Sequence, residues 1–286
     1  MAKKIGFVDY YISEWHANHY PEWIAKANEV LGTDFEVAYA WAELDTSPLD
    51  GVTTDQWCEK FGVTKCGTIA ELCEKSDHII VLAPSDPDKH LSYAQQVLPF
   101  GKRTYIDKTF APDLPTAKKI FDIGAQHGTD FFSSSALRYA DEVSELQDLG
   151  QLRSVVITGG GGNFNEYCIH LVEMAVALLG APVEKVKVEA MGDQRICRAV
   201  AANGSEAALI YSNGYNYTLM ALPMEGKFAR KAVASDFFVS LLQDIIHFFE
   251  TGEKSFDSAQ TLEVMRVRDA LLTAEAQDGQ WLTVGA

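Results

Sequence analysis

The sequence has few of the features that mark secreted, metal-binding or membrane proteins. Only five cysteines occur in 286 residues, and they form neither a Cys-x-x-Cys pair nor a zinc-like Cys/His pattern. No apolar run approaches the roughly 18 residues of a membrane span, and the N-terminus lacks the apolar core of a signal peptide. We therefore expect a soluble cytoplasmic protein without a metal site.

Positive charge is also scarce. The chain has 24 Lys and Arg against 40 Asp and Glu, a formal net charge of −16. Nucleic acids and anionic membranes are bound through clustered Lys and Arg, so we expect neither of them as a partner. We expect the partner to be a small-molecule substrate. The 47% hydrophobic and 22% charged residues are typical of a globular chain, long enough for two domains with cores of their own.

The first 133 residues alternate between short apolar strands and helices. The pattern predicts strands at 4–8, 35–40, 78–83, 104–106 and 129–133, with helices at 14–31, 54–61, 68–75, 89–100 and 114–127. Strands that alternate with helices form parallel sheets. We expect residues 1–133 to be a Rossmann-type, doubly wound α/β domain.

The rhythm changes after this point. Strands are predicted at 153–158, 183–190, 194–202, 207–211 and 217–222, and helices at 165–179, 237–250 and 259–276. Asn203-Gly204 is a favourable hairpin turn between two of the strands. We expect residues 134–286 to be an α+β domain with a mostly antiparallel sheet.

The dipeptide Asp107-Lys108 directly follows the strand predicted at 104–106. Ligands of open α/β sheets lie at the C-terminal ends of the strands. A lysine there can hold a substrate oxygen and stabilise developing negative charge, with the aspartate orienting or tuning it. The alternative is an ordinary surface ion pair.

Glu166, His170 and Glu173 have i, i+4 and i+7 spacing, which puts them on one face of a helix. A carboxylate one turn from a histidine can fix its tautomer, as a general acid/base requires. The alternatives are a solvated helix face with a partly buried histidine, or a metal site, for which further ligands are missing. His90, near the start of another helix, is a lone histidine of the kind that is more often structural.

Aromatic residues are dense near the N-terminus, where they could stack on a ligand or fill a core or subunit interface. They are Tyr10, Tyr11, Trp15, His16, His19, Tyr20 and Trp23. The glycine run at 159–162 is not followed by the Gly-Lys-Ser/Thr of a P-loop.

These motifs, in this order, resemble the Gfo/Idh/MocA family, the relatives of glucose–fructose oxidoreductase and inositol dehydrogenase. That family has a loop with a histidine, a helix, Gly-Lys and a Glu-Lys-Pro signature, where this chain has VLAPSDPDKH, a helix and FGKRTYIDKT. At the signature, this chain has Asp107 in place of the glutamate, the matching Lys108, and Thr109 in place of the proline. Glu166, His170 and Glu173 match a later acid, histidine and aspartate, and residues 135–138 fall where a family segment ends in arginine.

The resemblance covers most of the chain and implies hydride transfer between NAD or NADP and a sugar, polyol or related hydroxy/keto compound. It implies that Lys108 holds the reacting oxygen, that His170 transfers its proton and that Glu166 supports the histidine. It implies assembly into a homo-oligomer through the open face of the second-domain sheet. The cofactor contacts implied are Asp9, Tyr11, Ile12, Pro84, Ser85, His90 and Asp107.

The chain departs from the family at the first strand. The Gly-x-Gly-x-x-Gly fingerprint, which lets backbone N–H groups approach a pyrophosphate, is replaced by GFVDYYISE at residues 6–14. Side chains there would crowd the pyrophosphate, and Asp9 would add negative charge. Two hypotheses remain: a dehydrogenase with a rebuilt phosphate loop, and a non-catalytic ligand-binding or regulatory subunit that has lost the dinucleotide.

Overall fold

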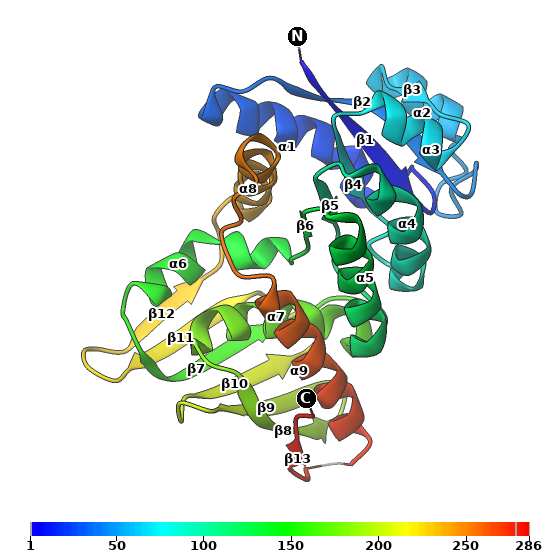
Figure 1. Cartoon of the computed structure of the whole chain (residues 1–286). Helices are drawn as coiled ribbons and strands as arrows, with labels where there is room; N and C mark the ends of the chain where they lie inside the picture. The colour runs from blue at the N-terminus through cyan, green and yellow to red at the C-terminus, as the bar shows by residue number, and fades with distance from the viewer. Residues whose placement is uncertain (1, 278, 286) are drawn as a thin grey trace. The chain divides into compact units, whose positions relative to one another are not determined.

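The computed structural model describes residues 2–277 and 279–285, in two compact units (Figure 1). Unit 1 extends to Ser134 and also includes Phe238–Asp257. Unit 2 comprises Ser135–Phe237 and the segment from Ser258 onward. The predicted division at 133/134 differs from this one because the segment 238–257, assigned above to the second domain, belongs to unit 1.

Unit 1 is built on six parallel strands. Their order is β3-β2-β1-β4-β5-β6, the strand order of the Rossmann fold, which confirms the predicted fold class. The strands are β1 (Lys3–Asp9), β2 (Phe35–Ala42), β3 (Thr64–Lys65), β4 (His78–Val81), β5 (Thr104–Ile106) and β6 (Phe131–Phe132). Residues 5–9 of β1 are all buried, as expected of a central strand.

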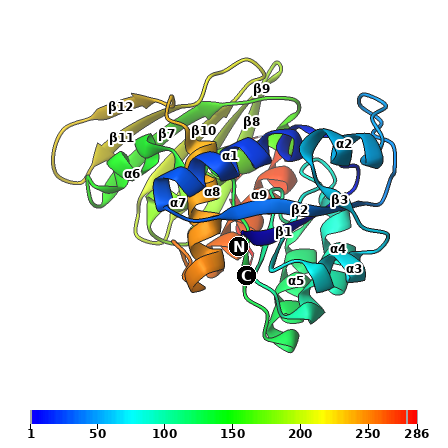
Figure 2. The ribbon, with the colours of Figure 1, turned by 90° about the horizontal axis from the view of Figure 1, so that it is seen from above.

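The helices of unit 1 start and end at residues suited to those positions. They are α1 (Trp15–Leu31), α2 (Thr54–Phe61), α3 (Ile69–Lys75), α4 (His90–Val97) and α5 (Leu114–His127). Gly32 ends α1 with φ +66°, a conformation that glycine adopts without steric cost. Figure 2 shows α1 running beside β2. In the described chain, none of the helices has the length and apolarity needed to cross a membrane.

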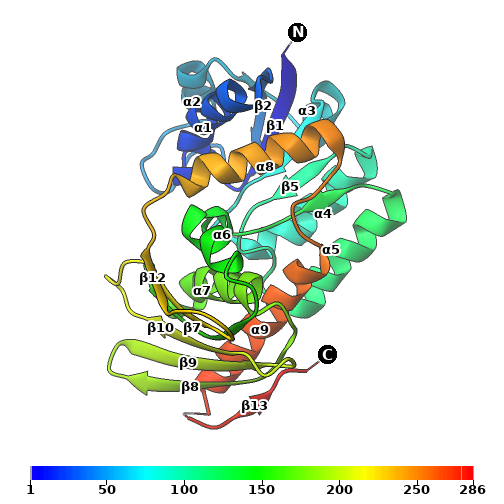
Figure 3. The ribbon, with the colours of Figure 1, turned by 90° about the vertical axis from the view of Figure 1, so that its left-hand side faces the viewer.

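The helix α8 (Phe237–Thr251) completes the core of unit 1 (Figure 3). Phe238 stacks on Trp23 of α1 with ring centroids 4.4 Å apart, and Phe249 stacks on His78 of β4 at 4.5 Å. Periodicity predicts that α8 has an apolar face, but it does not say which domain covers that face. This is why the sequence placed α8 in the wrong unit.

Unit 2 contains a mixed, mostly antiparallel sheet in the order β12-β11-β7-β10-β9-β8-β13, as predicted in kind. Its strands are β7 (Leu152–Gly159), β8 (Val183–Met191), β9 (Gln194–Ala201), β10 (Glu206–Tyr211), β11 (Thr218–Pro223), β12 (Ala229–Ala232) and β13 (Leu282–Thr283). Only β7 and β10 pair in parallel. The long helices α7 (Phe164–Leu179) and α9 (Ala259–Glu275) pack on this sheet, and the short α6 (Asp141–Gln147) packs on α7.

Within unit 2, the sheet face opposite α7 and α9 carries half-exposed apolar side chains. Val156 pairs with Met220 across β7 and β11, and Ile210 pairs with Ile196 across β10 and β9. All four alternate with buried residues along their strands. The two faces of the sheet therefore differ: one forms the core of unit 2, and the other presents apolar side chains that these helices leave uncovered.

Candidate functional site

Several predicted site residues meet at one edge of the unit 1 sheet. β1, β4 and β5 are neighbours, so Asp9, the loop that begins at Ala83 and the dipeptide Asp107-Lys108 share the C-terminal edge of the strands. The Ala83 N–H donates to Asp9 Oδ1 over 3.0 Å, and Lys108 Nζ donates to the Pro84 carbonyl over 3.2 Å. This edge is where open α/β sheets place their ligands.

Asp107 is buried and has its partners inside the protein. Its Oδ2 contacts Nδ1 of His16, and its Oδ1 accepts from the Lys108 N–H over 2.8 Å and lies 3.3 Å from the Tyr105 hydroxyl. Burial opposes ionisation, but the His16 ring holds the pKa of Asp107 below its ordinary value. Asp107 is 1% exposed, so its side chain lies in the core, and its expected contact with a cofactor stays a prediction.

Lys108 is half-buried, and its amine bonds to the Pro84 carbonyl rather than forming the surface ion pair considered above. Its peptide bond to Thr109 is cis. An ammonium group has three N–H donors, so the bond to Pro84 leaves capacity for a substrate oxygen. The side chain can therefore still hold a hydroxyl or carbonyl oxygen at the edge of the sheet.

The first turn of α1 is occupied by the protein's own carboxylate. Glu14 is the N-cap residue, and its side chain accepts from the backbone N–H of His16 over 2.7 Å and from that of Ala17. Backbone N–H groups at a helix N-terminus are the donors that bind a pyrophosphate in Rossmann folds. Glu14 is 6% exposed, so these donors are taken and covered.

Asp9, at the end of β1, is also buried. Its Oδ1 accepts from the N–H groups of Tyr10 and Ala83, whereas its Oδ2 has no hydrogen-bond partner. Ala83 has φ +65°, which costs about 1 kcal/mol or more in a residue with a Cβ, and its bond to Asp9 holds it there. Burial, and then the charge of Glu14, raise the pKa of Asp9 well above its ordinary value.

A pyrophosphate does not fit this loop in the position that the Rossmann fold gives it. It would meet the carboxyl groups of Asp9 and Glu14 and would find two N–H donors of the first turn already bonded. Ile12, another expected contact, is 1% exposed, so its side chain belongs to the core. Tyr11 is half-buried, and its ring lies 5.7 Å from that of Tyr10.

His90, another expected cofactor contact, has both ring nitrogens bonded to backbone carbonyl groups. Its Nε2 lies 2.6 Å from the Leu82 carbonyl and its Nδ1 lies 3.0 Å from the Phe110 carbonyl. The residue is completely buried, and burial lowers its pKa. It ties the end of β4 to the segment after β5. Of the two other expected contacts in this region, Pro84 is buried and Ser85 is exposed.

In unit 2, His170 of α7 is hydrogen-bonded to a residue that the spacing argument missed. Its Nδ1 lies 2.7 Å from the hydroxyl of Ser135, a buried residue just before α6. Glu166, expected to support the histidine, bonds through its own N–H and Oε2 to Asn163, the N-cap of α7. The only signal for Ser135 was the family position of residues 135–138.

Glu173 forms a buried ion pair with Arg138. The Arg138 Nε lies 2.5 Å from Glu173 Oε1, and Arg138 Nη1 donates to Gln260 Oε1 over 2.8 Å. Burial raises the pKa of Glu173, and Arg138 offsets this in part. The pair fastens the 3₁₀ turn Ala136–Tyr139, and with it Ser135, to α7. Among residues 2–277 and 279–285, no three His, Cys, Asp or Glu side chains are placed to hold a metal.

The N-terminal aromatic cluster fills the core of unit 1. Tyr20 is completely buried and stacks on His16 with ring centroids 5.5 Å apart. Trp23 is 9% exposed and stacks on Phe238. Trp15, in contrast, is 50% exposed. The core interpretation therefore holds for Tyr20 and Trp23, and Trp15 alone of these three offers a surface for stacking.

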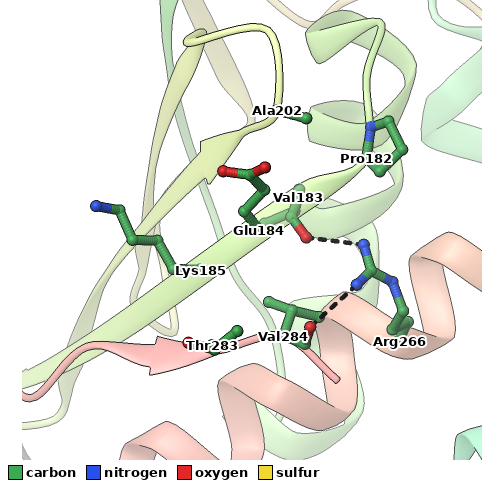
Figure 4. Close-up of a pocket in the computed structure, with 8 residues that line it drawn as sticks. All are labelled: Pro182, Val183, Glu184, Lys185, Ala202, Arg266, Thr283 and Val284. Atoms are coloured by element: carbon green, nitrogen blue, oxygen red, sulfur yellow. Dashed lines mark hydrogen bonds between the residues drawn. The ribbon is translucent and has the colours of Figure 1, made fainter. Parts of the chain in front are cut away.

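A pocket of about 450 Å³ lies in unit 2 between β8, β13 and α9 (Figure 4). The guanidinium of Arg266, a residue that lines this pocket, donates to the Val183 carbonyl over 2.7 Å and to the Val284 carbonyl over 3.3 Å. It also forms two hydrogen bonds to Glu263. The Arg266 guanidinium is thus bonded to the protein itself; Glu184 and Lys185 also line this pocket, which contains none of the predicted site residues.

The sequence matches no protein-family model and no curated protein. Solved structures do match. A probable dehydrogenase from Thermotoga maritima is 14% identical, with a TM-score of 0.80 and 98% of each chain covered. A myo-inositol dehydrogenase from Corynebacterium glutamicum is 13% identical, with a TM-score of 0.80 and 100% of each chain covered. GenD2 from gentamicin A biosynthesis, in a complex with NAD, is 14% identical, with a TM-score of 0.80, and the match covers 100% of this chain and 97% of GenD2.

The chain has the fold of the inositol dehydrogenases. This agrees with the fold implied by the resemblance to the Gfo/Idh/MocA family. At 13–14% identity the likeness establishes the fold, and function depends on the residues of the site.

Proposed function

We propose that this protein is an oxidoreductase that acts on a hydroxyl or keto carbon of a sugar, a polyol or a related small molecule. The observation that carries the proposal is the half-buried Lys108 at the end of β5, in a chain whose whole length matches dehydrogenase structures. A lysine at the C-terminal edge of a parallel sheet is suited to hold a reacting oxygen.

The proposed roles concern the substrate. Lys108 Nζ would donate to its reacting oxygen and stabilise the negative charge that develops there. His170 would take up or deliver the hydroxyl proton through Nε2, since Ser135 holds Nδ1. Glu166 would add negative charge to the same helical face. NAD or NADP is the cofactor that the fold implies, but the phosphate loop does not fit its pyrophosphate as the residues stand.

A second candidate is a non-catalytic protein that binds a small molecule or regulates a partner. The observation that favours it is the Glu14 carboxylate on the first-turn N–H groups of α1. A chain that no longer bound a dinucleotide would be free to fill this position with its own side chain. Its ligand would still be expected at the C-terminal edge of the strands.

Titration of the purified protein with NADH and NADPH, followed by calorimetry or nucleotide fluorescence, separates the two candidates. The oxidoreductase predicts saturable binding, followed by turnover of at least one member of a panel of sugars and polyols. Lys108→Ala should abolish that turnover without loss of nucleotide binding. No binding of either nucleotide at millimolar concentration would reject the oxidoreductase and leave the second candidate. A cytoplasmic location, where reduced nucleotides are supplied, is part of the first proposal.

A further inference from the structure

The N-terminus of α1 lies at the end of β1, where the Rossmann fold places the pyrophosphate of a dinucleotide. A helix of 17 residues places a partial positive charge at its first turn, together with N–H groups that have no partner within the helix. In this chain the Glu14 carboxylate accepts from two of these groups. No other acidic residue lies in the first turn, so Glu14 alone supplies the negative charge there.

The neighbourhood of Glu14 adds further negative charge. Burial, and next the charge of Glu14, raise the pKa of Asp9, and Asp107 acts on both carboxyl groups in the same direction. The ring of His16 lies in this cluster, and its Nδ1 is bonded to Asp107. Asp9 Oδ2 is buried without a hydrogen-bond partner, so the cluster contains an acceptor that nothing yet satisfies. A doubly charged phosphate group entering here would be repelled.

One N–H group cannot give a full hydrogen bond to both Glu14 and a phosphate oxygen. We propose that Glu14 is an internal occupant of the pyrophosphate position, so that its cap on α1 and the binding of a dinucleotide at α1 exclude one another. This inference rests on the proposed nicotinamide-dependent function. It deepens that function, because a nucleotide would have to displace Glu14 before its phosphates reached the helix.

The test compares Glu14→Ser, Glu14→Gln and the wild type with two probes, NADH and inorganic pyrophosphate. Serine is a good N-cap, so the helix should remain intact while the carboxylate is lost. Glutamine keeps the length of the side chain without its charge. Glu29→Ser is the matched control, because it removes the same charge from an exposed position near the C-terminus of α1. Circular dichroism verifies that each variant is folded.

Glu14→Ser should bind both probes about tenfold more tightly than the wild type or more, a change typical of one charge-assisted contact. The affinity of Glu14→Gln for both probes should lie between those of Glu14→Ser and the wild type. The affinity of Glu29→Ser should equal that of the wild type. Equal affinities of the wild type and both Glu14 variants for pyrophosphate would overturn the inference. Tighter pyrophosphate binding by Glu14→Ser, with no NADH binding by any variant, would support the inference and reject the proposed cofactor. NADH-dependent turnover that neither Glu14 variant changes would reject the inference and support the proposed cofactor.

Discussion

His16 Nδ1 and Asp107 Oδ2 are in direct contact in the interior of unit 1, so the first turn of α1 is bonded to the end of β5. The His16 ring also stacks on Tyr20, with an interplanar angle of 13°. The contact therefore ties the N-terminal end of α1 to the residue that follows β5 at the C-terminal edge of the sheet.

Removal of His16 should destabilise unit 1. His16→Ala leaves the buried Asp107 carboxylate without its side-chain partner, and breaking a buried pair in this way costs about 3 kcal/mol or more of unfolding free energy. Urea unfolding followed by circular dichroism measures the loss, with His127→Ala at an exposed helix end as the control. If His16→Ala cost no more than His127→Ala, the contact would not be a stabilising one. The double variant His16→Ala/Asp107→Ala should cost less than the sum of the single variants.

Lys108→Ala should lower turnover by about 100-fold or more while the fold stays intact, because the side chain holds a reacting oxygen and does not fill the core. Steady-state kinetics on whichever polyol or sugar proves to be a substrate gives the comparison. Lys118→Ala, on the exposed side of α5, removes the same charge and should retain full turnover. Retention of near wild-type turnover by Lys108→Ala would end the proposed role.

Asp9→Asn should raise the melting temperature at about pH 8. Because the pKa of Asp9 is raised in the folded state, its carboxyl contributes favourably to the free energy of unfolding at low pH. This contribution is complete below the ordinary pKa of 3.8 and is lost as the pH rises through the folded-state pKa. Asparagine keeps an acceptor for Tyr10 and Ala83 and carries no buried charge. The gain over the wild type should shrink as the pH is lowered from 8, because the raised pKa lets the Asp9 carboxyl take up a proton in the folded state. A constant difference across this range would show that ionisation of Asp9 is not its cause, and Asp34→Asn provides an exposed control.

His78 should make the protein sensitive to moderate acid. Burial against Phe249 lowers its pKa from 6.5 to about 4, so the folded state holds the neutral ring. The stabilisation is complete above pH 6.5 and is lost as the pH falls from there toward 4. Melting curves between pH 7 and 4.5 should fall less steeply for His78→Gln than for the wild type. Parallel pH dependences of the two proteins would contradict the assignment.

The open face of the unit 2 sheet should mediate self-association. Val156, Ile196, Ile210 and Met220 form adjacent pairs on this face, and apolar patches of this kind are typical of protein interfaces. Sedimentation velocity should show an oligomer that Ile210→Asp dissociates, because a carboxylate in an apolar interface is costly. Glu225→Lys, in the turn after β11, serves as a surface control. A monomer at micromolar concentration would contradict this prediction.

The sequence predicted what depends on local pattern. Five of the six strands of unit 1, its helices α1 to α5, the hairpin at Asn203-Gly204 and the place of Lys108 follow from periodicity, turn residues and strand ends. The two-residue strand β3 was not predicted. The contact between His16 and Asp107 spans 91 residues and has no local signal. Asp107 beside Lys108 looked like a surface pair because composition does not tell which neighbour a carboxylate will find.

The phosphate loop illustrates the same limit. The missing glycines were visible in the sequence, and crowding by side chains was the natural inference. That Glu14 would fold back onto the N–H groups of His16 and Ala17 depends on its side-chain conformation, which the pattern that placed the helix at 14–31 does not specify. The sequence showed that the glycines are missing, and the structure shows which side chain, that of Glu14, occupies the N–H groups in their place.

The return of α8 to unit 1 has a consequence for how the chain folds as it leaves the ribosome. Unit 1 begins with the first strand but is complete only when residues up to Asp257 have been made. Until then Trp23 and His78 lack the aromatic rings that cover them, so a nascent first unit exposes apolar surface. Vectorial synthesis cannot finish the N-terminal unit first, as it does in chains with contiguous domains. The fragment that ends at Ser134 should accordingly aggregate when expressed alone, and supplying Phe238–Asp257 as a tethered segment should rescue it.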